Sequence, residues 1–101
     1  MSIQTVREIL HQPEAFEGKT VALNGWVRTA RDVKACAFVE LNDGSVVTNI
    51  QLVADAQGEH YRTAAGLNVG TAIRVTGVVE KSPNPKQPVE VKLQSLEIEG
   101  E

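Results

Sequence analysis

The stretch QGEHYRTAAG, residues 57–66, interrupts a chain whose other long segments alternate between apolar and polar residues. Alanines and long polar side chains replace the β-branched residues that come before and after it, and Gly66 stands where a helix would end. The stretch therefore predicts a helix of about two to three turns between two groups of strands.

Three strands are predicted on the N-terminal side of this helix, at residues 19–29, 35–41 and 46–54. Gly25 interrupts the apolar alternation of the first strand and predicts a bend or a bulge there. The charged residues 31–34 predict a loop after it. Asp43-Gly44 between the second and third strands is typical of a β-hairpin.

Two further strands are predicted after the helix, at residues 72–81 and 89–98. Between them, residues 82–88 contain three prolines, which remove backbone donors and predict an irregular segment. At the other end of the chain, Thr5 and Glu8 have the spacing of a capping box, and Pro13 marks the limit of the short helix that they begin.

The predicted order is therefore a helix, three strands, a helix and two strands. This order is typical of the OB-fold, an all-β, five-stranded Greek-key barrel with a helix between strands 3 and 4. An SH3-like barrel also has about five strands, but it would not explain the helix at residues 57–66. Since the sequence shows neither a repeat nor a low-complexity linker, we expect residues 1–101 to form a single domain.

Composition restricts the function further. Ten basic and thirteen acidic residues give a net charge of −3, which argues against coating nucleic acid through bulk basicity. The single Cys36 cannot form an internal disulfide, and two distant histidines, His11 and His60, do not suggest a metal site. We expect no metal and no cofactor. Without an apolar run long enough for a membrane or a signal peptide, a cytoplasmic location is expected, with no membrane partner.

Strand alternation indicates which side chains face outward, because successive residues point to opposite faces. Val39 and Leu41 form the natural core pair of the second strand, so Phe38 and Glu40 lie on the other face. The same alternation places amides, acids and a lysine of the third and fifth strands outward (Asn49, Gln51, Glu90, Lys92 and Gln94).

An exposed ring, amides and cations are the groups that bind unpaired bases, by stacking, base-edge hydrogen bonds and phosphate contacts. Residues 28–34 supply Arg28, Arg31 and Lys34 against a single acid, Asp32. Other interpretations stay open at this point: Phe38 could fill an end of the barrel, and the cations could be an ordinary solvated loop. For Trp26 we favour packing in the core or at the barrel rim over a second stacking surface.

Two motifs in order and spacing, GWVRTARD (25–32) and FVELNDGS (38–45), resemble the N-terminal anticodon-binding domain of class II aminoacyl-tRNA synthetases of the aspartyl, asparaginyl and lysyl subgroup. Three further stretches are similar to the asparaginyl branch: TVREIL (5–10), the segment from TGV (76–78) to KQPVEV (86–91), and the longer hairpin after residue 43. The chain departs from the family pattern at Ala30 and at residues 35–37, where relatives carry larger or basic residues.

This resemblance implies roles for individual residues. Phe38 matches the aromatic residue that stacks on the central anticodon uridine, and Gln51 the amide that hydrogen-bonds it. Arg31 matches an arginine that contacts the anticodon, and Glu90 an acid close to it. The implied partner is the anticodon loop of tRNA-Asn, with anticodon GUU, and Arg28 and Lys34 are expected to add phosphate contacts.

The family's class II catalytic domain, which would lie in cis, is absent from these residues, and no catalytic residue set is visible, so the chain alone is not expected to be an enzyme. We expect the isolated domain to be a monomer and the intact synthetase a homodimer. The alternative function is a free-standing or engineered OB-fold interaction module that binds protein or other single-stranded nucleic acid.

Overall fold

The computed structural model describes residues 3–83 and 87–100. These residues form five strands and three short helices, in the order α1 (Val6–His11), α2 (Pro13–Phe16), β1 (Thr20–Asp32), β2 (Cys36–Asn42), β3 (Ile50–Asp55), α3 (Tyr61–Ala65), β4 (Ala72–Lys81) and β5 (Val89–Gly100). The predicted order of elements is confirmed, with α2 added. Three residues of the segment predicted to be irregular, 84–86, lie outside the described residues.

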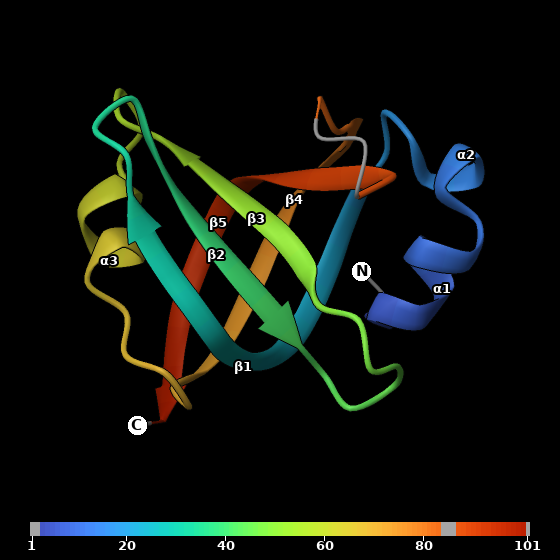
Figure 1. Ribbon diagram of the computed structural model, residues 1–101, viewed down its shortest axis with the longest axis horizontal. Helices are drawn as coiled ribbons and strands as arrows, with labels where there is room; N and C mark the ends of the chain where they lie inside the picture. Colours follow the sequence, from blue (N-terminus) through green and yellow to red (C-terminus); the bar gives the residue numbers. More distant parts are fainter. Residues whose placement is uncertain (1–2, 84–86, 101) are drawn as a thin grey trace.

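The five strands close into a barrel in the order β1-β2-β3-β5-β4 (Figure 1). Strand β1 takes part twice, because residues 20–26 pair with β4 and residues 26–32 pair with β2. The ring is completed by a parallel pairing of β3 with β5, whereas the other neighbours are antiparallel. This topology, with α3 between β3 and β4, confirms the all-β OB-fold.

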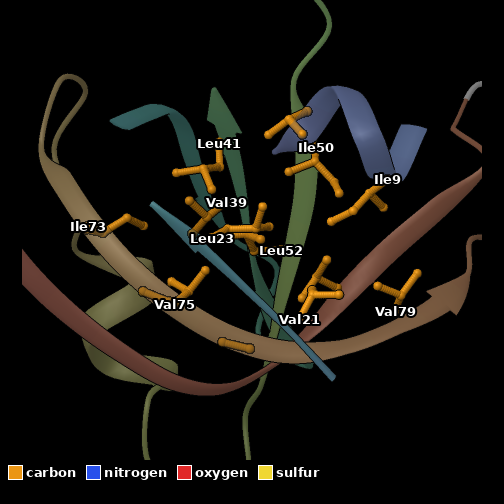
Figure 2. Close-up of a cluster of buried hydrophobic side chains, with 14 of the residues drawn as sticks. Ile9, Val21, Leu23, Val39, Leu41, Ile50, Leu52, Ile73, Val75 and Val79 are labelled. Atoms are coloured by element: carbon orange, nitrogen blue, oxygen red, sulfur yellow. The ribbon is translucent and has the colours of Figure 1, made fainter. Parts of the chain in front are cut away.

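Inward-facing aliphatic side chains from every strand fill the barrel (Figure 2). The predicted core pair of β2, Val39 and Leu41, is almost completely buried. Val6 and Ile9 of α1 and Ala64 of α3 join the same cluster, so the two helices contribute to the core from different sides of the barrel (Figure 1). The capping box predicted for α1 is present, with Thr5 as N-cap and Glu8 three residues later.

The hairpin between β2 and β3 is longer than predicted, because β3 begins at Ile50 rather than at residue 46. The side-chain amide of Asn42 explains the difference. It donates to the carbonyl oxygens of Val46 and Val47, at 3.2 and 3.4 Å, and these bonds hold both residues in the loop. Gly44 adopts the left-handed φ of +82° that this turn requires.

The helix after β3 is shorter than predicted, since a turn precedes it. The carboxylate of Asp55 accepts from the Gln57 backbone N–H at 2.9 Å, and its carbonyl accepts from Gly58 at 2.8 Å. Regular helix therefore begins only at Tyr61, while Gly66 follows its end as expected. The unpredicted α2 is a single turn with Pro13 at its first position, where the missing proline N–H costs nothing.

The bend or bulge predicted at Gly25 is present as a bulge a few residues further along β1. The register of β1 against β2 shifts between Val27 and Thr29, which makes Arg28 the extra residue of the bulge. Gly25 has a different role: a Cβ atom at this position would lie 2.4 Å from the backbone oxygen of Asn42. Glycine is required here because β1 and β2 approach each other too closely for any side chain.

Candidate nucleic-acid interface

The outer surface of the barrel presents a row of side chains that crosses four strands. Successive partners in the sheet are Arg31 of β1, Phe38 of β2, Val53 of β3 and Lys92 of β5. Phe38 is half-buried and lies outside the core cluster, as the strand alternation predicts. The guanidinium carbon of Arg31 lies 5.6 Å from the centre of the Phe38 ring, within the range of a cation–π contact.

A second row runs beside the first and is polar. It joins Thr29, Glu40, Gln51 and Glu90 in successive strands, and Glu80 of β4 pairs with Glu90 beyond them. The two rows place Gln51 and Glu90 next to the row that contains Phe38. Three of the predicted site residues thus lie on one continuous surface formed by three strands: Phe38, Gln51 and Glu90. Arg31 adjoins this surface.

Gln51 and Glu90 point outward, but they are much less exposed than outward polar residues usually are. Their exposed fractions are 9% and 8%, because each lies between neighbouring strands whose side chains cover it. Neither side chain hydrogen-bonds another residue in the described part of the chain. An amide and a carboxylate that are little exposed, have no side-chain hydrogen bond and still reach the surface are well suited to bind a ligand.

Burial also affects the acidity of Glu90. Removal of the carboxylate from water raises its pKa, the nearby Lys92 ammonium opposes this shift, and the Glu80 carboxylate adds to it. Lys92 itself lies 3.4 Å from a carboxylate oxygen of Glu80. The site therefore contains an acid that accepts a proton more readily than a solvated glutamate.

The cations Arg31 and Lys34 are exposed at one end of this surface. Asp32 organises the turn that follows, because its carboxylate accepts from the Lys34 backbone N–H at 2.7 Å and from the Tyr61 hydroxyl of α3. The Tyr61 bond is the larger cause of a lowered Asp32 pKa, and it raises the pKa of Tyr61 in turn. Helix α3, which lies beside this end of the barrel (Figure 1), thus tethers the turn that carries Lys34.

The structure separates Arg28 from the other predicted residues. It protrudes at the bulge and lines a groove with Trp26, on the part of the surface where the β2–β3 loop begins. Trp26 is 37% exposed and lies outside the core, so of the two placements expected for it core packing is wrong. Packing at the barrel rim is not contradicted, because the indole lies close to Gly44 of the β2–β3 loop. The alternation of Val21, Leu23 and Val27 was the signal that could have placed Trp26 on the outer face.

Cys36 is half-buried on β2, and burial is the main cause of its raised pKa, which favours the thiol over the nucleophilic thiolate. Within residues 3–83 and 87–100, no group of three His, Cys, Asp or Glu side chains could hold a metal ion. In the same residues, no helix is long and apolar enough to cross a membrane.

Comparison with known proteins identifies the family. Residues 21–99 match the model of a tRNA anticodon family described as an OB-fold nucleic acid binding domain. The chain is 39% identical over 100 residues to an asparagine–tRNA ligase of Clostridium botulinum, a match that covers 99% of this chain and 22% of the ligase. The chain thus spans about a fifth of the length of such relatives, and their catalytic domain is absent from it.

Comparison with solved structures points to the same family. Asparaginyl-tRNA synthetase from Pyrococcus horikoshii, complexed with asparaginyl-adenylate, matches 99% of this chain with a TM-score of 0.83 and 26% identity, over 23% of the synthetase chain. An OBody bound to hen egg-white lysozyme has a TM-score of 0.80, with 99% of both chains covered, but at 18% identity this likeness shows the fold alone. The chain belongs to the tRNA anticodon-binding family of OB-fold nucleic acid binding domains and is similar to that domain of asparaginyl-tRNA synthetases.

Proposed function

We propose that this domain binds the anticodon loop of tRNA-Asn, stacks one unpaired base on Phe38 and binds the edge of that base through Gln51 and Glu90. The observation that supports this most directly is the adjacency of a half-buried ring to a desolvated amide and a desolvated carboxylate, neither with a partner in the described residues. Stacking supplies affinity, and polar groups at the base edge supply selectivity.

The chemistry of the two polar groups suits uracil. The Gln51 amide offers a donor and an acceptor together, which complements the N3–H donor and carbonyl acceptor on the edge of uracil. The Glu90 carboxylate accepts hydrogen bonds when it is ionised. Arg31 extends over the Phe38 ring, so it lies close enough to contact a stacked base. Lys34 at the adjoining turn is exposed, and its proposed role is to bind phosphate.

The proposal treats residues 1–101 as one anticodon-binding domain that acts in the cytoplasm, in cis with the catalytic domain of an asparaginyl-tRNA synthetase. The relatives' names and the small share of their length that this chain covers support that arrangement. We further propose that the isolated domain is a monomer and that the intact ligase is a homodimer.

The stacking role is tested by titrating an anticodon stem-loop of tRNA-Asn, with anticodon GUU, at low salt. We expect Phe38→Tyr to bind like the parent, because the ring is kept. Phe38→Leu keeps an apolar side chain without the ring, and we expect it to lose about 1–3 kcal/mol, or about 5- to 150-fold in affinity. Thermal melting confirms that each variant is folded.

Selectivity is tested with a second stem-loop in which cytidine replaces the central uridine. Cytosine reverses the donor and acceptor pattern of the base edge, so we expect weaker binding, and the difference should shrink in Gln51→Ala. Equal affinity of parent and Phe38→Leu would contradict stacking, and equal affinity for both loops would contradict the role of Gln51. A folded parent that binds neither loop would overturn the proposal and favour a protein-binding module instead.

A further inference from the structure

A second aromatic surface lies on the same side of the barrel as Phe38. Trp26 of β1 is 37% exposed, although a tryptophan is the side chain with the most apolar area to bury. It lines a groove of about 430 Å³ with Arg28, Asn42, Val46, Val47 and Asn49. Neither the predicted RNA site nor the core packing accounts for the exposure of this ring.

The lining of the groove favours one class of ligand. Arg28 is its only charged side chain, is exposed, and forms no ion pair with another described residue. An indole surface beside an unpaired guanidinium is the combination that binds a nucleobase together with its phosphate. An apolar protein segment in this groove would leave the Arg28 guanidinium without a partner.

Hydrogen bonds connect the groove with the proposed anticodon site. The Asn42 amide donates to the side-chain oxygen of Asn49 at 2.9 Å, and the Asn49 amide donates to the Glu40 carboxylate at 3.0 Å. Glu40 is the direct neighbour of Gln51 in the sheet. The groove is therefore continuous with the row that contains Gln51 and Glu90.

The spacing of the two rings suits a single strand of RNA. Trp26 pairs with Asn42 and Arg31 pairs with Phe38, so the two rings are four residues apart along β2. At about 3.3 Å per residue this separation is about 13 Å, a length that a few nucleotides span. Other OB-folds bind about 4–16 nucleotides, which is more than a single stacked base.

We propose that the Trp26 groove is a second stacking subsite for the same RNA strand. A loop nucleotide that is not a neighbour of the base on Phe38 stacks on the indole, and Arg28 binds its phosphate. This inference rests on the proposed function and adds to it a subsite outside the Phe38–Gln51–Glu90 surface.

The chain provides its own reporter, because Trp26 is its only tryptophan. The intrinsic fluorescence of the parent is followed while the GUU stem-loop is titrated, and accessibility to acrylamide is measured with and without RNA. We expect quenching by the RNA and protection from acrylamide in the complex. Phe38→Leu should bind more weakly but show the same protection once it is saturated, because its indole subsite is intact.

Affinity gives an independent measurement by a method that does not use fluorescence of the protein. We expect Trp26→Leu to weaken stem-loop binding at least about 5-fold, the lower limit for one stacked base, and Trp26→Phe to retain most of it. Arg28→Gln should weaken binding and reduce its dependence on salt. Should Trp26→Leu fail to fold, the fluorescence and acrylamide measurements on the parent still decide the question.

The outcomes separate this inference from the proposed function. If the parent binds RNA, but Trp26 stays accessible to acrylamide and Trp26→Leu binds equally well, the second subsite is wrong and the Phe38 site stands. The groove would then be open to a protein occupant, such as another domain of the ligase. If the folded parent binds no RNA, the proposed function and this inference fail together.

Discussion

At the scale of single residues, the outward-facing polar side chains of the site are less exposed to water than their positions in the strands predict. Glu90 faces outward, yet it is only 8% exposed because β3 and β4 flank it. Burial without a hydrogen-bond partner is unfavourable for the ionised form, so the folded domain tolerates this carboxylate at a cost in stability.

The loss of stability caused by burying the Glu90 carboxylate depends on pH and can be measured. In the folded domain the pKa of Glu90 is raised, mainly by burial, whereas the unfolded chain keeps the usual value. Well below that value both states are protonated and the carboxyl has no effect. As the pH rises, the unfolded chain ionises first, so the native state loses stability until the pH exceeds the raised pKa.

We therefore expect Glu90→Gln to be more stable than the parent at neutral pH, with the difference vanishing as the pH falls below about 4, near the ordinary pKa of glutamate. Urea unfolding across this pH range measures the effect. Glu97→Gln, an exposed acid on the same strand, is the matched control. A parent and a Glu90→Gln variant with parallel stability profiles would contradict the desolvation argument.

At the scale of elements, the β2–β3 loop connects a terminal helix with the binding surface. Asp43 accepts from the Val6 backbone N–H at 2.9 Å, and Ser45 accepts from the Arg7 backbone N–H at 3.0 Å. These bonds satisfy first-turn N–H groups that a helix cannot satisfy itself. A six-residue helix such as α1 would not persist alone, so the loop and the Thr5 cap hold it against the barrel.

Removal of the contact between Asp43 and α1 should destabilise both the helix and the β2–β3 loop. We expect Asp43→Ala to lower the free energy of unfolding by about 1–2 kcal/mol, as for the loss of a helix cap, and the melting temperature by about 4–8 °C for each kcal/mol. Glu14→Ala, an exposed acid in the first turn of α2 outside these contacts, should change little. An unchanged melting temperature for Asp43→Ala would show that the loop does not cap α1.

At the scale of the whole molecule, the net charge of −3 conceals an uneven distribution. Three cations, Arg28, Arg31 and Lys34, lie on the exposed part of β1 and the turn after it, whereas three of the thirteen acids lie in the last five residues of the sequence. Lys92, the cation nearest Glu90, is paired with Glu80. Few cations of this surface are thus available for phosphates, which suits recognition of a short unpaired segment rather than nonspecific coating.

The number of cations on this surface that contact phosphates sets the salt dependence of RNA binding. If the three cations each contact one phosphate, a plot of log affinity against log salt should have a slope of about −2, since each contact with a single strand contributes about −0.7. Arg31→Gln should reduce the steepness by about 0.7. Arg74→Gln removes a cation that is already paired with Glu99, so its slope should match the parent. A parent slope near zero would contradict phosphate binding by this face.

Local pattern was sufficient for most elements. The capping box of Thr5 and Glu8, the bounds of β4 and the core pair of β2 follow from the identities of neighbouring residues. The strand and helix patterns failed where a side chain bonds to backbone a few residues away, as Asn42 does in the β2–β3 loop and Asp55 does in the turn before α3. In such segments a single hydrogen bond outweighs the residue's own preference for strand or helix.

The outward direction of Phe38, Gln51 and Glu90 follows from local pattern, because the two-residue period of a strand is a property of its own backbone. Which residues meet depends on the closed barrel: the parallel pairing of β3 with β5 places Gln51 beside Glu90, and Arg28, at the β1 bulge, lines a groove with Trp26 and not with Phe38. Register between strands depends on hydrogen bonds between segments far apart in the chain, so no local pattern contains it.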